Sequence, residues 1–304
     1  MPATVPATDH RRGILLAASG VLVLSFDALL IRLADVDPWT VAFWRGGLMA
    51  LSLGVLVLVT TRSEGYRLLG RHLGATLLLA VLYGVNGTLF VLSVSHTSVA
   101  NTVVILSSSA LFAALFSWLL LRERVRRRTW MAIAVSVAGV VLVFAGSLGG
   151  SGWTGDLLAL ALALSTGLML SIMRRYPLIP RMPIVALSGL VMALLALPQV
   201  GGPGLPDRGF VWLAVMGLVQ IPLASVLLMS ATRHLTSPEV SLFLLIETVF
   251  GPAWVWLVLR EPVPPSTLLG GTAILAAIAM HSWLALREQR IRESAPAARA
   301  LRLH

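Results

Sequence analysis

The stretch Leu121-Arg-Glu-Arg-Val-Arg-Arg-Arg-Thr129 returns 138 residues later as Leu259-Arg-Glu-Pro-Val-Pro-Pro-Ser-Thr267. The same register aligns three further pairs of residues: Trp118 with Trp256, Phe112 with Phe250, and His96 with His234. Chance similarity between apolar segments does not explain a shared polar Arg-Glu. Self-similarity at a fixed offset indicates two copies of one structural unit. The fold is therefore expected to consist of two halves.

The composition indicates that these halves lie in a membrane. The chain has 304 residues, of which 57% are hydrophobic and only 12% are charged, and its mean hydropathy is +0.89. Soluble domains are about 45–50% apolar and about 25% charged, which excludes a disordered, collagen-like or ordinary cytosolic enzyme class. A helix needs about 20 apolar residues to cross a bilayer. Ten segments meet that requirement: 13–34, 38–60, 73–94, 98–121, 129–147, 154–175, 183–200, 209–232, 237–260 and 266–287.

The positions of the arginines give the orientation. All 23 basic residues are Arg. If the ten segments cross in turn, nineteen of these Arg lie on the side of the N-terminus, and one, Arg45, lies within the second segment. Only Arg32, Arg208 and Arg260 lie on the opposite side. Positive charge is retained on the cytoplasmic side of a membrane, so both termini are predicted to be cytoplasmic. The net charge of +10 is thereby explained without a nucleic-acid partner.

The repeat is predicted to be inverted, because five spans per half insert the second half upside down. The residues Arg126, Arg127 and Arg128 of the first copy become Pro264, Pro265 and Ser266 in the second. This loss of charge is expected of a loop that faces the other side. We expect an all-α membrane protein with ten transmembrane helices, in repeats 13–147 and 154–287, followed by a cytoplasmic tail, 288–304. Inverted repeats are typical of secondary transporters, whose substrate site lies between the halves near the midplane.

Three stretches resemble a known family: Asp37-Pro-Trp-Thr-Val-Ala-Phe-Trp-Arg45, Gly155-Asp156 and Ile246–Glu261. They are similar to EamA-type transporters of the drug/metabolite transporter (DMT) superfamily. The resemblance implies a multi-pass protein of the bacterial inner membrane that exports a small metabolite, such as an amino acid, by alternating access. Asp27 departs from the family, many of whose members have a small or amide residue there.

Three ionisable side chains lie deep within the predicted spans. Asp27 and Arg45 lie roughly 5 and 6 Å outward from the middles of the first two helices, at 1.5 Å per residue. They either form a charge pair that joins these helices or form a substrate site, and Arg45 could also extend toward the outer surface. Glu247 lies near the middle of the ninth span, five residues before Pro252, a candidate hinge. It either binds a cation or proton or bonds structurally to a neighbouring helix.

The weaker candidates are polar or aromatic side chains within the spans. Ser109 aligns with Glu247 in the repeat, which would make both walls of a central cavity polar. These side chains either line that cavity or form hydrogen bonds between helices. The full set is Trp44, Tyr83, Asn86, Asn101, Ser108, Ser109, Gln220 and Trp254.

Enzyme chemistry is not expected. The chain has no Cys, no phosphate-binding loop, no His-Glu-x-x-His and no grouping with metal-ligand spacing, so we expect no cofactor or metal. One deep base and two deep acids suit an amino acid, which carries both charges. The alternatives are an exporter of lipophilic or quaternary-ammonium cations and a non-transporting membrane protein. The expected partners are the substrate and the bilayer. The Ala- and Gly-rich fifth and tenth spans either pack together or form a homodimer.

Overall fold

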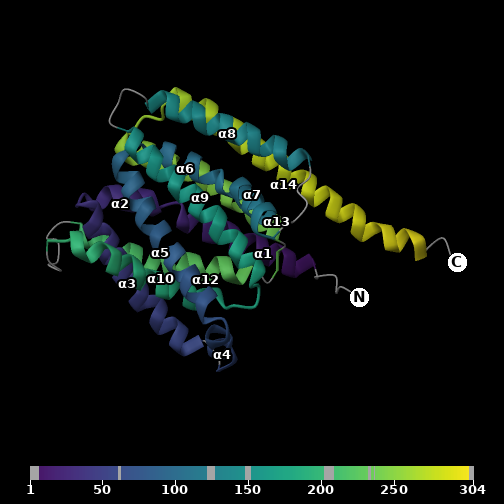
Figure 1. The fold of residues 1–304 in the computed structure, drawn as a ribbon, viewed down its shortest axis with the longest axis horizontal. Coiled ribbons are helices and arrows are strands. Elements are labelled where there is room, and N and C mark those ends of the chain that lie inside the picture. Colours follow the sequence, from purple (N-terminus) through teal and green to yellow (C-terminus); the bar gives the residue numbers. More distant parts are fainter. Residues whose placement is uncertain are drawn as a thin grey trace.

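A computed structural model describes residues 7–60, 63–121, 127–147, 152–201, 209–231, 234–235 and 237–300. These residues form a helical bundle without strands (Figure 1). The α-helices are α1 (Ala7–Leu24), α2 (Asp27–Ala34), α3 (Pro38–Thr60), α4 (Ser63–Arg71), α5 (Leu73–His96), α6 (Val99–Ser107), α7 (Ser109–Leu121), α8 (Arg127–Ser147), α9 (Trp153–Arg175), α10 (Arg181–Ala196), α11 (Phe210–Ala214), α12 (Ile221–Ala231), α13 (Ser237–Leu259) and α14 (Pro265–Ala300). A 3₁₀ turn, η1 (Leu197–Gln199), and a π-helical turn, η2 (Val215–Gln220), complete the elements.

Nine helical segments among the described residues are long and apolar enough to cross a membrane: Arg11–Ala34, Pro38–Thr60, Leu73–His96, Val99–Leu120, Thr129–Ser147, Trp153–Arg175, Arg181–Gln199, Phe210–Ala231 and Pro265–Leu284. Each coincides closely with a span expected from the sequence. The remaining expected span, 237–260, coincides with helix α13. Helix α13 has 23 residues, and Ile246–Leu259 is a shorter apolar segment within it.

Two of the spans are interrupted and a third contains a π-helical turn, which the sequence did not predict. The first span is interrupted at Ser25 and Phe26, the fourth at Ser108, and the eighth contains η2. At two of these breaks a serine bonds to the preceding turn: Ser25 Oγ donates to Leu22 O at 2.7 Å, and Ser108 Oγ donates to Ile105 O at 2.6 Å. Such local bonds compete with the helical ladder. Backbone groups freed inside a membrane need other partners, so the breaks mark places where neighbouring helices must supply them.

Helices from the two halves of the chain pack against each other throughout the bundle. Helix α3 packs against α10, α8 against α14, α5 against α9 and α10, and α1 against α12. Figure 1 shows α8 and α14 side by side. A Cβ atom built on Gly139 would lie 2.8 Å from Gly270 O, so these two helices approach as closely as glycine allows. The small-residue fifth and tenth spans therefore pack together within one chain.

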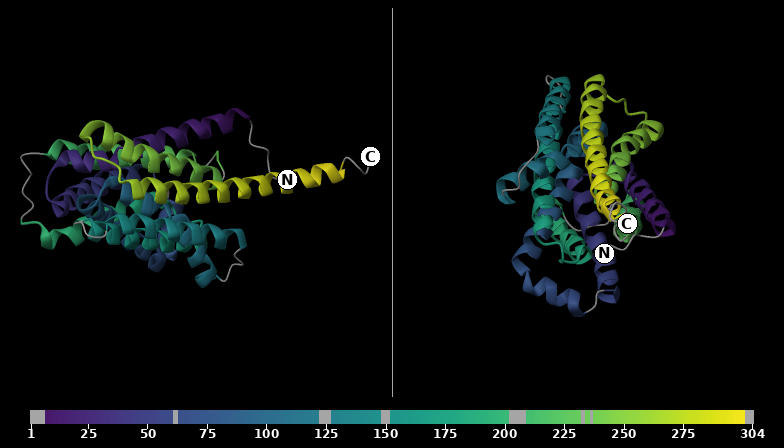
Figure 2. Two further views of the ribbon diagram at one scale, coloured as in Figure 1. Left: turned by 90° about the horizontal axis from the view of Figure 1, so that it is seen from above. Right: turned by 90° about the vertical axis from the view of Figure 1, so that its right-hand side faces the viewer.

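The C-terminal helix is longer than its membrane span. Helix α14 runs to Ala300, through most of the stretch expected to be a tail. Figure 2 shows α14 projecting beyond the rest of the bundle, and the start of α1 lies at this same end. The two ends of the described chain are thus on one side of the helices.

Candidate functional site

Asp27 and Arg45 form a buried ion pair. Asp27 is the first residue of α2, directly after the break in the first span, and Arg45 comes from α3. Arg45 Nη2 donates to Asp27 Oδ2 at 2.7 Å, and only 5% of Asp27 and 8% of Arg45 is exposed. The sequence predicted that Asp27 and Arg45 lie at similar depth on consecutive helices, and in the structure they are in direct contact.

The ion pair leaves hydrogen-bonding capacity unused. Among the described residues, Asp27 Oδ1 and Arg45 Nε and Nη1 are buried atoms without a hydrogen-bond partner. The guanidinium carbon of Arg45 lies 6.0 Å from the centre of the Phe90 ring, within cation–π range. Unpaired polar atoms are unfavourable in a low-dielectric interior. The pair therefore presents one acceptor and two donor groups that a ligand could satisfy.

The break beside Asp27 is held by two other helices. Gln220 Nε2, at the end of η2, donates to Val23 O and to Leu24 O, each at 3.2 Å. Trp254 Nε1 of α13 donates to Ser25 Oγ at 3.0 Å, and its ring stacks on Phe26 with centroids 4.8 Å apart. The carbonyls freed by the break thus have partners inside the protein, as a membrane interior requires.

Replacing Gln220 with Leu is expected to lower the free energy of unfolding by about 1–3 kcal/mol, because the carbonyls of Val23 and Leu24 lose their side-chain donor. Thermal unfolding in detergent would measure the change. Val219→Leu is the matched control, because Val219 is the preceding residue and is 54% exposed. Equal unfolding temperatures for the two variants would contradict the role of Gln220 at the break.

Glu247 lies half-buried on α13, near the same break. Gly251, one turn further along the helix, faces the first span: a Cβ built on it would lie 3.9 Å from Ser25 O. Helix α13 packs against α2, which begins with Asp27, so the two acids lie on neighbouring helices. Pro252 lies within α13, which continues from Ser237 to Leu259, so the candidate hinge does not interrupt the helix here.

Three other candidates have contacts of their own with other helices. The Trp44 ring packs edge-on against Phe210 of α11, with centroids 5.4 Å apart. Asn86 Nδ2 lies 3.7 Å from Met169 Sδ of α9, and Tyr83 packs against a separate apolar cluster that includes Met169.

The two serine candidates lie at the break in the fourth span. Ser108 lies between α6 and α7 and is 1% exposed, with its hydroxyl bonded within its own turn. Ser109 is the first residue of α7 and is 9% exposed. The structure thus groups Gln220, Trp254 and Glu247 around Asp27 and Arg45, and places the two serines at a different break.

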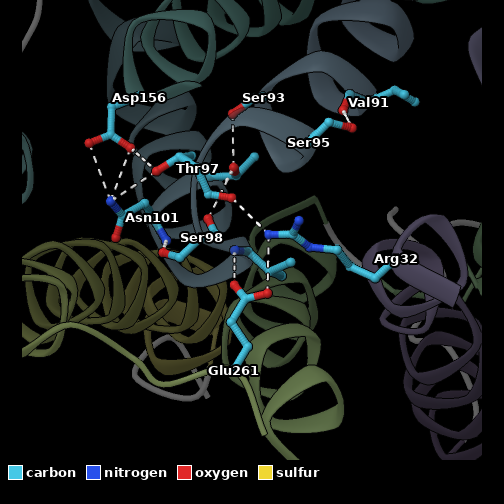
Figure 3. A network of polar contacts seen from close by, with 11 residues as sticks. Arg32, Val91, Ser93, Ser95, Thr97, Ser98, Asn101, Asp156 and Glu261 are labelled. Atoms are coloured by element: carbon cyan, nitrogen blue, oxygen red, sulfur yellow. Dashed lines mark hydrogen bonds and ion pairs between the residues drawn. The ribbon is translucent and has the colours of Figure 1, made fainter. Parts of the chain in front are cut away.

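Asn101 belongs to a second polar network (Figure 3). The network lies beside α2, at the end of the bundle opposite the termini (Figure 1). Asn101 Nδ2 lies 3.0 and 3.2 Å from the two carboxylate oxygens of Asp156, which is fully buried at the start of α9. Thr97 Oγ1 donates to the same carboxylate at 2.6 Å, and Thr267 of α14 donates to Asn101 Oδ1. Asn101 therefore joins the α5–α6 turn to α9 and α14.

The sequence did not single out Ser25, Phe26 or Phe90. Ser25 directly precedes the one deep acid of the first span, so a serine that can bond its own backbone there was an available signal. Phe90 gave no such signal, because a phenylalanine within an apolar span is most simply read as lipid-facing or core.

An apolar helical bundle, with a break in its first span beside a buried ion pair, is typical of a polytopic membrane transporter. The model of the EamA-like transporter family matches residues 11–145 and 153–283. The chain belongs to this family, and through it to the DMT superfamily, as its sequence motifs predicted.

The chain is also similar to two other proteins. The chain is 23% identical over 262 residues to an uncharacterized transporter of Clostridium kluyveri, covering 80% of this chain and 82% of that protein. It also matches a crystal structure of a protein with a TM-score of 0.60 at 16% identity, covering 90% of this chain and 98% of the other. The second likeness shows a shared fold.

Proposed function

We propose that this protein is a secondary transporter of the bacterial inner membrane, with ten transmembrane helices in two inverted repeats, 13–147 and 154–287, and cytoplasmic termini. Two observations support the repeat. The family model matches two successive ranges of similar length. The helix contacts also have the symmetry of a repeat, in which α1 corresponds to α9, α3 to α10, α5 to α12 and α8 to α14. The contact of α5 with α9 then has its counterpart in the contact of α12 with α1, and the contacts α3–α10 and α8–α14 each join two corresponding helices. Helix α13 supplies the ninth span in this scheme.

The packing suggests which helices move in alternating access. A first group consists of α1, α2, α12 and α13, in which α1 contacts α12 and α13, and α2 contacts α13. A second group consists of α5, α6, α7 and α9, in which α9 contacts the other three. The groups meet where α13 packs against α6 and α2 against α5. Relative movement of the two groups would expose a site between them to each side in turn.

The proposed substrate is an amino acid or a related compound, and export is the proposed direction. The buried Asp27–Arg45 pair carries this proposal, because its unused donors and acceptor offer both charges to a zwitterion. A carboxylate would bind the free edge of the Arg45 guanidinium. An α-ammonium would bind Asp27 or the nearby Glu247.

Lipophilic or quaternary-ammonium cations are the second candidate substrates. The observation in their favour is the aromatic cluster beside Asp27, in which Trp254 stacks on Phe26 and lies 5.7 Å from the Phe250 ring. Aromatic faces next to a carboxylate suit such cations. In this case Arg45 would only balance the charge of Asp27.

Purified protein in liposomes tests both candidates. Asp27→Asn and Glu247→Gln are each expected to reduce amino-acid flux at least about tenfold, because each removes a charge that contacts the bound substrate. Asp35→Asn is the control, since Asp35 is exposed at the end of α2. Unchanged amino-acid flux in both variants would contradict the zwitterion site. Competition by a quaternary-ammonium dye, with loss of dye flux in Asp27→Asn, would favour the cation exporter.

A further inference from the structure

A second ion pair lies at the end of the bundle opposite the termini. Arg32 Nη2, in the last turn of α2, lies 3.1 Å from Glu261 Oε2, just after the end of α13. The side chains are 28% and 23% exposed. Both residues belong to the first helix group, and Figure 3 shows them facing the α5–α6 turn of the second group.

Each partner of this pair also bonds to that turn. Arg32 Nη2 donates to Thr97 O at 3.0 Å, and Val99 N donates to Glu261 Oε1 at 2.9 Å. Val99 is the first residue of α6, so its N–H has no partner within the helix. A carboxylate at this position also interacts favourably with the helix dipole. Arg32 thus bonds to a backbone carbonyl of the second group, and Glu261 bonds to a backbone N–H of the same group.

The backbone at the end of α13 is shaped to place Glu261 there. Arg260 has φ of 58°, in the left-handed region that non-glycine residues seldom adopt. Its N–H still closes the helix, at 2.9 Å from Trp256 O, so the chain turns sharply only after the last helical bond. This turn directs Glu261 back toward α6.

The α5–α6 turn is itself bonded to α9, within the second helix group. Thr97 and Asn101 both bond to Asp156 of α9, and Ser93 Oγ donates to Gly155 O at 2.8 Å. The turn should therefore move with α9. Any separation of the two groups at this end must break the bonds that Arg32 and Glu261 make to Thr97 and Val99.

We propose that Arg32 and Glu261 form an outer clasp, which holds the transporter closed on the face opposite its termini and opens when the site turns to that face. This role rests on the proposed alternating access. Val103 of α6 lies beneath the clasp and is 5% exposed, and a Cβ built on Gly251 of α13 would lie 3.9 Å from its Cγ2. Opening of the clasp would separate α6 from α13 and expose position 103.

The natural sequence has no Cys, so a single Val103→Cys substitution gives a specific reporter. Its labelling by a membrane-impermeant maleimide is measured in right-side-out and inside-out vesicles. Arg32→Gln or Glu261→Gln is expected to raise the labelling rate about threefold or more, in right-side-out vesicles alone, because the open population grows. Labelling of the denatured protein gives the maximum extent of maleimide labelling at position 103.

Arg260→Gln is the matched control. It removes the same charge beside Glu261, but the Arg260 guanidinium lies over the Trp256 ring at 5.8 Å, away from the clasp. Its labelling rate should stay at that of the Val103→Cys parent. An unchanged rate in the Arg32→Gln and Glu261→Gln variants, or an equal rise from both faces or in Arg260→Gln, would overturn the clasp. Labelling needs no substrate, so a failed amino-acid flux test leaves this measurement unaffected.

Discussion

Replacing Arg45 with Met is expected to abolish transport and to lower the free energy of unfolding by about 3–5 kcal/mol. The reason is the burial of Asp27, which is 5% exposed and whose carboxylate receives its one hydrogen bond among the described residues from Arg45. Without that partner, a charge is left in a membrane interior. Unfolding in detergent and flux in liposomes measure the two effects. Arg260→Met makes the same change at an exposed position and should alter stability by about 0.5 kcal/mol or less.

The double variant Asp27→Leu/Arg45→Met separates the structural and functional roles of the pair. Apolar residues of similar volume often replace a buried ion pair without loss of stability. The free energy of unfolding should therefore return to within about 1 kcal/mol of the natural protein, while transport remains absent. Natural rates of transport in the double variant would show that the pair only joins α2 to α3. A double variant as unstable as Arg45→Met would show that the two charges do not depend on each other.

The membrane spans could be predicted from sequence because each is a long signal made by many residues. A run of about 20 apolar side chains tolerates errors of a few residues at its ends, and Pro38 begins α3 just as the sequence indicated. A charge pair between Asp27 and Arg45 was one of the alternatives that the sequence offered, for a different reason. Deep charges are rare, and two at one depth on consecutive helices have few other partners.

The breaks in the spans could be predicted only in part. Ser25 and Ser108 bond to their own turns, which is a local signal, but the contacts that hold the first break come from distant parts of the chain. Gln220 reaches the carbonyl of Val23, 197 residues away in sequence, and it is placed there by the π-turn η2. Asn101 was a reasonable candidate for a cavity lining, but its partner Asp156 lies 55 residues away. The sequence marks Arg32 only as an arginine on the side opposite the N-terminus, and Glu261 only as part of the repeated Arg-Glu and of a family-like stretch. Their pairing depends on how the two helix groups pack.

Helices α3 and α10 cross at two closely packed glycines, where an added methyl group is expected to destabilise the protein. A Cβ built on Gly46 would lie 2.7 Å from Gly189 O and 2.9 Å from Ala193 N, which are backbone atoms that cannot rotate away. Gly46→Ala is therefore expected to lower the free energy of unfolding by about 1–3 kcal/mol. It should also reduce transport, because Arg45 is the preceding residue and moves with α3. Gly47→Ala is the matched control, with nothing within 4 Å of the added atom, and helix propensity predicts a gain of about 0.5–1 kcal/mol.

The same crossing makes a prediction about the partner helix. A Cβ on Gly189 would lie 2.6 Å from Gly46 O, so Gly189→Ala should destabilise the protein as much as Gly46→Ala. One added methyl group already forces α3 and α10 apart, and the gap that it opens admits the second. The loss in Gly46→Ala/Gly189→Ala should therefore be smaller than the sum of the single losses by about 0.5 kcal/mol or more. Strict additivity, or equal unfolding temperatures for Gly46→Ala and Gly47→Ala, would mean that these two helices do not meet at their glycines.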